Sequence, residues 1–179
     1  EQAMLARDNL HLAVVGDIGR AELRRVMRDV FSTLPAHNKM PQIAPAEIAN
    51  GPQTRHIDRA GPQTSVVFAQ QGLGHHHPLF FADFVMNSIL GGSGFSSRLT
   101  EQVREARGLA YGVYSFTSNV QKAALWNGSV ASDNTTAQGA VNVIRAEMRR
   151  MADEPVSAPR LAAAKTYLTG NYALRFDSG

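Results

Sequence analysis

One stretch constrains the fold of this chain more than any other: residues 90–118, which read LGGSGFSSRLTEQVREARGLAYGVYSFTS. Its order is a glycine-rich turn, a short amphipathic helix, a glycine break and a strand. Leu99 and Val103 recur at helical spacing, and Gly108 ends that pattern before apolar and small residues begin to alternate. The sequence therefore predicts a helix that turns directly into a strand.

The turn before this helix is rich in glycine. Gly91, Gly92 and Gly94 allow backbone conformations that other residues rarely adopt. Ser96 or Ser97 can cap the helix by accepting a hydrogen bond from one of its free N–H groups. We expect a loop that feeds a helix.

Arg104 and Tyr111 lie on either side of the predicted glycine break. Arg104 is on the last turns of the helix and Tyr111 is near the start of the strand. Because the chain changes from helix to strand between them, their side chains can converge on one point. A guanidinium and a phenolic O–H are donors suited to holding a peptide carbonyl and its developing negative charge.

The runs SSRL and REARGLAY, with the glycine-rich turn before them and the alternating strand after them, resemble the C-terminal-type domain of the insulinase or pitrilysin family of zinc metallopeptidases, which includes the mitochondrial processing peptidases. The likeness extends more weakly over most of the chain. It implies that Arg104 and Tyr111 are the family's Arg and Tyr pair, which binds substrate near the scissile bond. The pair would face a zinc ion held by a different domain or subunit.

The rest of the chain predicts an α+β fold. Strand patterns cover residues 10–15, 54–59, 64–71 and 123–131 and the run from Tyr111, while helical stripes cover residues 21–34, the stretch after Pro78, the central helix, the stretch after Ser132 and the run from Leu161. Together they indicate an antiparallel or mixed sheet of about five strands with helices packed on one face, a two-layer sandwich. The resemblance implies the same architecture.

With 179 residues, the chain is expected to form a single domain, residues 1–179. Its abrupt ends suggest a fragment of a longer, two-domain peptidase-like chain. No apolar run of about 18 residues occurs, so we expect no membrane span and a soluble protein, with cytoplasm and periplasm both open. The net charge of +3 is dispersed, which argues against a nucleic-acid surface.

A metal site is not predicted in this chain. Cysteine is absent, and none of the six histidines begins the inverted His-x-x-Glu-His motif, which the resemblance implies for zinc binding. The triplet His75, His76 and His77 lacks an acidic residue at helical spacing, which favours surface polar residues. Zinc would belong to the full assembly, held by another domain or subunit, and the fragment alone should be inactive.

The resulting hypothesis is a substrate-binding, non-zinc-bearing domain of a zinc metalloendopeptidase. Arg104 and Tyr111 would act on the substrate carbonyl, and a substrate-side loop would comprise Gly91, Gly92, Ser93, Gly94 and Phe95. Its partners would be a peptide or unfolded polypeptide and a zinc-bearing homologous domain, in a heterodimer or a two-domain chain. The alternative is a catalytically inactive structural or assembly subunit of the same fold, like the core proteins of the respiratory bc1 complex.

Overall fold

The structure, a computed structural model, describes residues 4–46, 51–92, 96–120 and 122–174. The chain divides into two compact units, Glu1–Ala44 and Pro45–Gly179. The first unit contains a short 3-10 helix, η1 (Arg7–Asn9), and the helix α1 (Arg20–Phe31), whose apolar residues all remain at least partly exposed. The helix predicted at residues 21–34 is therefore present.

Residues 10–15 do not form the predicted strand. They have no ladder partner, and Val15 is fully exposed. A β-strand is stabilised by pairing with a neighbour, and the described residues of the first unit contain no second strand. An alternating apolar pattern was not sufficient to make one.

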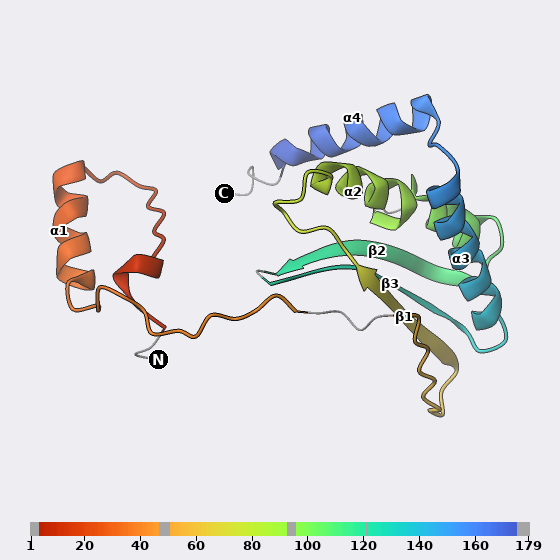
Figure 1. Ribbon diagram of the computed structural model, residues 1–179. Coiled ribbons are helices and arrows are strands. Elements are labelled where there is room, and N and C mark those ends of the chain that lie inside the picture. Colours follow the sequence, from red (N-terminus) through yellow and green to blue (C-terminus); the bar gives the residue numbers. More distant parts are fainter. Residues whose placement is uncertain (1–3, 47–50, 93–95, 121, 175–179) are drawn as a thin grey trace. The chain divides into compact units, whose positions relative to one another are not determined.

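The second unit holds the sheet and most of the helices. Its elements, in chain order, are β1 (Gln63–Gln71), α2 (Phe80–Asn87), the π-helical turns η2 (Ser88–Gly92) and η4 (Thr100–Glu105), β2 (Ala110–Val120), β3 (Ala123–Asp133), α3 (Ala137–Asp153) and α4 (Ala158–Leu174). Within this unit, α2 and α4 lie above the same face of the sheet (Figure 1).

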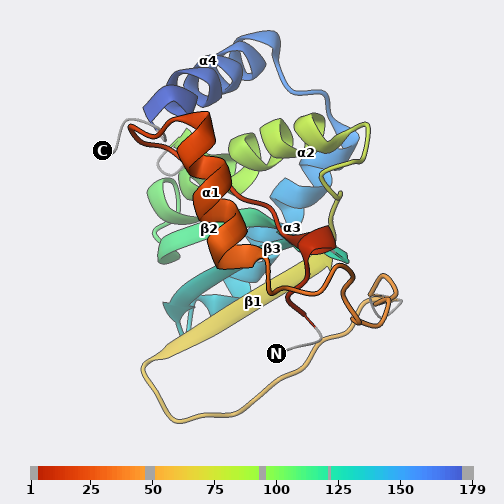
Figure 2. The ribbon, with the colours of Figure 1, turned by 90° about the vertical axis from the view of Figure 1, so that its left-hand side faces the viewer.

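The sheet has three antiparallel strands in the order β1-β3-β2, with β3 in the centre (Figure 2). Val130 of β3 pairs with Val66 on one side and with Val113 on the other. The expected number of about five strands is not confirmed for the described residues. In residues 54–59 the charged side chains Arg55, Asp58 and Arg59 are exposed, and the segment has no ladder partner.

The β2–β3 hairpin joins the two strand runs expected from Tyr111 and at residues 123–131. Val120 pairs with Ala123, which leaves a two-residue connection at positions 121 and 122, although Gln121 lies outside the described residues. A register shift between Ala110 and Gly112 places Tyr111 at an irregularity of β2. The pairing of β2 with β3 is therefore irregular at the beginning of β2, close to where the chain leaves η4.

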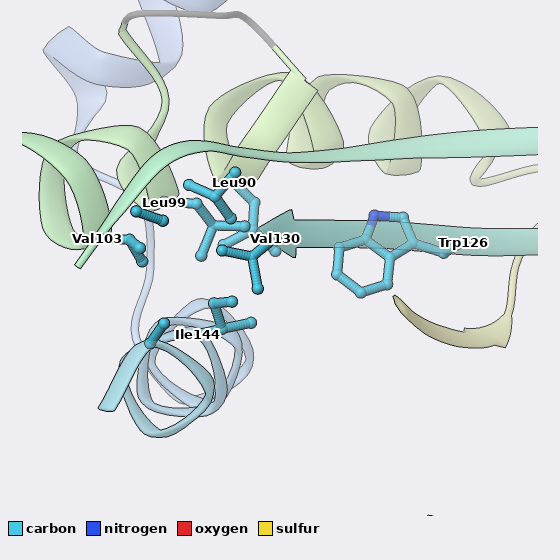
Figure 3. Packing of buried hydrophobic residues seen from close by; sticks show 9 residues of the cluster. Leu90, Leu99, Val103, Trp126, Val130 and Ile144 are labelled. Atoms are coloured by element: carbon cyan, nitrogen blue, oxygen red, sulfur yellow. The ribbon is translucent and has the colours of Figure 1, made fainter. Parts of the chain in front are cut away.

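One face of the sheet and the helices above it share a buried core (Figure 3). Alternate β3 residues, including Trp126 and Val130, point inward and meet apolar residues of the helical segments. The cluster consists of Leu90, Leu99, Val103, Ala110, Val113, Trp126, Val130, Ala140 and Ile144. All of it lies in the second unit, so the α+β architecture with helices against one sheet face is present there.

Candidate functional site

The segment that carries Arg104 is fixed by its buried face. Leu99 and Val103 have no exposed surface and belong to the core cluster. Ser97 accepts a hydrogen bond through its Oγ from the backbone N–H of Thr100 at 3.3 Å, which confirms the predicted serine cap. The helical pattern seen in the sequence thus corresponds to a segment whose apolar side chains are buried in the core.

A tight reversal connects this segment to β2. Gly108 adopts a left-handed conformation with φ of 58°, and its N–H donates to the carbonyl of Arg104 at 2.9 Å. The N–H of Leu109 donates to the carbonyl of Val103 at 2.8 Å. Residues other than glycine adopt this conformation only at a cost in energy, so Gly108 is the residue that allows the chain to turn here.

The reversal brings Arg104 and Tyr111 together. The central carbon of the Arg104 guanidinium lies 4.9 Å from the centroid of the Tyr111 ring, a cation–π contact. Tyr111 is 85% exposed, and Arg104 is half-buried. The convergence inferred from the sequence is therefore present, and the tyrosine side chain is accessible from solvent.

This arrangement places a cation and a phenol side by side on the surface. The guanidinium lies over the ring face, which restricts its position and leaves the Tyr111 O–H at the ring edge. Such a pair can approach a carbonyl oxygen with a fixed geometry.

The first two glycines of the turn have packing contacts. Gly91 is buried, and a Cβ there would overlap the hydroxyl of Ser115 and lie 2.9 Å from the backbone nitrogen of that residue. Gly92 is exposed, yet a Cβ there would meet the side-chain amide of Asn87 at 2.5 Å. Close approach to β2 explains the glycine at position 91, and close approach to Asn87 of α2 explains the glycine at position 92. The remaining members of the predicted loop, Ser93, Gly94 and Phe95, lie outside the described residues.

A buried amide behind the turn was missed by the sequence analysis. Asn87 Oδ1 accepts hydrogen bonds from the Ser115 hydroxyl at 2.7 Å and from Trp126 Nε1 at 2.8 Å. These three residues come from α2, β2 and β3. Nothing local in the sequence distinguishes Asn87 from a surface asparagine, because its partners are 28 and 39 residues away.

A buried ion pair was missed for the same reason. Arg98 Nε donates to Glu147 Oε2 at 2.8 Å, across a sequence separation of 49 residues. The exposed fractions of the two side chains are 9% and 10%. The pair joins the segment before η4 to α3.

One carboxylate of α2 has an unusual environment. The Oδ2 atom of Asp83 is buried and has no hydrogen-bond partner among the described residues. Burial raises the pKa of the Asp83 carboxyl above its ordinary value, because desolvation penalises the charged form. Asp83 is not close in sequence to Arg104 or Tyr111.

A cavity of about 210 Å³ lies between α2, η2 and α4. Asn87 and Gly92 line one side, and Tyr167 and Asn171 of α4 line another. Neither Arg104 nor Tyr111 belongs to its walls. The cavity is therefore separate from the stacked pair.

The described part of the chain holds no group of three or more side chains that could bind a metal ion. The histidine triplet has other contacts: the ring of His75 packs on Phe80 with centroids 4.7 Å apart, and His77 Nδ1 accepts from the N–H of Leu79 at 3.1 Å. The histidine side chains of this triplet do not fit a zinc site. Over the same residues, no helix combines the length and apolar character needed to cross a bilayer.

Comparison with known proteins decides the family. A family model described as the Peptidase M16 inactive domain matches residues 2–168. The chain belongs to this family. The resemblance seen in the SSRL and REARGLAY runs is thereby confirmed, since the predicted family is that of the M16 peptidases.

Bacterial relatives support the assignment. The chain is 28% identical to a Streptomyces coelicolor protein named an uncharacterized zinc protease, over 95% of this chain and 39% of that protein. It is 25% identical to the Bacillus subtilis uncharacterized zinc protease YmxG, over 96% of this chain and 41% of that protein. The chain thus spans about two fifths of the length of these relatives.

Solved structures agree with this fold. The crystal structure of a peptidase M16 inactive domain from Pseudomonas fluorescens matches with a TM-score of 0.74 and 30% identity, over 88% of this chain and 38% of that one. A conserved protein from Enterococcus faecalis also matches with a TM-score of 0.74, at 21% identity, over 92% of this chain and 38% of that one. The second likeness concerns the fold alone.

Proposed function

We propose that this M16 inactive domain is the substrate-contacting part of a zinc metalloendopeptidase whose zinc is held elsewhere, in the same chain or in a homologous partner subunit. The observation that carries the proposal is the stack of Arg104 on Tyr111, on an accessible surface. The relatives named as zinc proteases support the reaction class. Their greater length leaves room for a zinc-bearing part.

In this proposal the pair acts on the carbonyl of the scissile peptide bond. The Arg104 guanidinium and the Tyr111 O–H donate hydrogen bonds to the carbonyl oxygen, on which negative charge develops as the bond is attacked. The stacked geometry keeps both donors in place before the substrate arrives, so little reorganisation is needed. Zinc, when bound in its own domain, would activate the attacking water.

The glycine-rich stretch would provide a second contact with the substrate. Gly92 and the following residues Ser93, Gly94 and Phe95 would contact the polypeptide beside the scissile bond, as the resemblance implies. Gly91 is buried against Ser115. Its part is to bring η2 close to β2.

The test is cleavage of an unfolded polypeptide by the intact protein with its zinc-bearing part. Arg104→Ala and Tyr111→Phe should each lower kcat/KM by about one to three orders of magnitude, as loss of a donor to an oxyanion does. Tyr111→Phe is informative because it keeps the ring under the guanidinium and removes only the hydroxyl. Thermal stability should change little, since Tyr111 is 85% exposed.

Matched controls exist in the same elements. Arg107→Ala removes an exposed arginine three residues away, and Tyr114→Phe removes an exposed hydroxyl from the same strand. Both should cleave at the wild-type rate. Wild-type cleavage by Arg104→Ala and Tyr111→Phe would refute the assigned roles. An intact, zinc-loaded protein that cleaves no polypeptide would instead favour the structural or assembly subunit.

A further inference from the structure

The helical segment that presents Arg104 is fastened to two other helices by ion pairs. Arg98 forms the buried pair with Glu147 of α3. Glu101 accepts from Arg160 of α4 at 2.9 Å and 3.1 Å, and Arg160 also donates to the carbonyl of Ser96 at 3.2 Å. A short segment is thus held at both its buried and its partly exposed sides.

The reversal after this segment is also braced from the α3 side. The Ser132 hydroxyl, at the end of β3, donates to the carbonyl of Leu109 at 2.5 Å, and the Thr136 hydroxyl reaches the same carbonyl at 3.3 Å. Ser132 is 1% exposed. The β3–α3 corner therefore fixes the backbone between Arg104 and Tyr111, while α3 itself fixes the backbone before Arg104.

Stability alone does not account for the Arg98–Glu147 pair. Both side chains are about nine-tenths buried, and Arg98 Nη2 has no hydrogen-bond partner among the described residues. Desolvation of two charges consumes most of the attraction between them, and apolar residues of similar volume often stabilise such a site equally well. What apolar residues cannot reproduce is a directional bond between one guanidinium and one carboxylate.

We propose that Arg98 and Glu147 are positioning residues: their buried ion pair sets the orientation of residues 96–105 on α3 and so holds the Arg104 guanidinium over the Tyr111 ring. The inference rests on the proposed function for its effect on cleavage. Its effect on the Arg104–Tyr111 contact follows from the geometry alone. Neither positioning residue touches the substrate in this scheme.

The decisive variant replaces both members of the pair. Arg98→Met together with Glu147→Leu removes the charges and keeps the site apolar and filled, so the intact protein should melt close to the wild-type temperature. Its stack should nevertheless loosen. With 3-fluorotyrosine incorporated, the ¹⁹F resonance assigned to Tyr111 by its loss in Tyr111→Phe should move toward its position in Arg104→Ala.

Cleavage provides a second readout. In the double variant kcat should fall about tenfold or more, because a small displacement of a donor is costly in the transition state, and KM should change little. Glu147→Gln is the milder variant, since it keeps the shape and an oxygen acceptor for Arg98 Nε. It should shift the Tyr111 resonance in the same direction by a smaller amount.

The control is Glu154→Gln, which removes the negative charge from the exposed Arg150–Glu154 pair at the end of the same helix. It should leave the Tyr111 resonance and kcat at wild-type values. A wild-type Tyr111 resonance in the double variant or, should that variant not fold, in Glu147→Gln would overturn the positioning role, as would an equal shift in Glu154→Gln. A protein that shows the shift but cleaves nothing would keep the positioning role and reject the proposed peptidase function.

Discussion

Single glycines determine how closely the helical turns approach the sheet. Gly91 and Gly139 both lie in helical segments, yet their surroundings differ. A Cβ at Gly91 would overlap the Ser115 hydroxyl and contact Leu99 at 3.0 Å, whereas at Gly139 it would meet only the Leu109 side chain at 3.7 Å. The first glycine is required by packing, and the second is a position where a methyl group fits.

The two glycines make opposite predictions. Gly91→Ala should lower the free energy of unfolding by about 1–3 kcal/mol, because the extra methyl overpacks the contact between η2 and β2. Gly139→Ala should raise it by about 0.5–1 kcal/mol, since alanine favours a helix over glycine. Urea denaturation of the two variants measures both. Equal stability of Gly91→Ala and wild type would show that η2 can move away from Ser115 without cost.

At the scale of the elements, local patterns predicted the parts whose partners are near in sequence. The reversal from η4 into β2 was predictable because Gly108 lies between a helical and an alternating pattern, and it brought Arg104 to Tyr111. Residues 10–15 and 54–59 alternate too, but a strand also needs a neighbour, which their own patterns do not specify. The Arg98–Glu147 pair depends on a contact across 49 residues.

Asn87 joins α2 to both β2 and β3, and its contribution to stability can be tested by substitution. Asn87→Leu removes the acceptor shared by the Ser115 hydroxyl and Trp126 Nε1, both inside the core. Each buried donor without a partner costs about 1–3 kcal/mol, so the variant should lose about 2–6 kcal/mol of unfolding free energy. Asn142→Leu, at an exposed asparagine of α3 whose side-chain oxygen accepts from Gln138, should change stability by less than about 0.5 kcal/mol.

A double-mutant cycle identifies the cause. Adding Trp126→Phe to Asn87→Leu removes one of the two stranded donors, so the double variant should be more stable than the sum of the single effects indicates. Simple additivity would mean that the loss comes from the changed shape of the Asn87 site rather than from the hydrogen bond to Trp126.

For the whole molecule, the core is confined to one of the two units. Every member of the buried cluster, from Leu90 to Ile144, lies after Pro45. Among the described residues of the first unit, Ala6 is the one buried apolar side chain. The expectation of a single domain over residues 1–179 rests on the length and the apolar content of the chain, and it stays a prediction.

Residues 45–179 are accordingly predicted to fold without the first unit. The chain has one tryptophan, and Trp126 is 2% exposed with its indole N–H bonded to Asn87, so its emission reports directly on the core. A chain of residues 45–179 should show the short-wavelength emission of a buried indole and one cooperative urea transition. Residues 1–44 alone should show no cooperative transition, because burial of apolar surface is the main force that opposes chain entropy. Solvent-like Trp126 emission from residues 45–179 would mean instead that the core forms only when all 179 residues fold together as one domain.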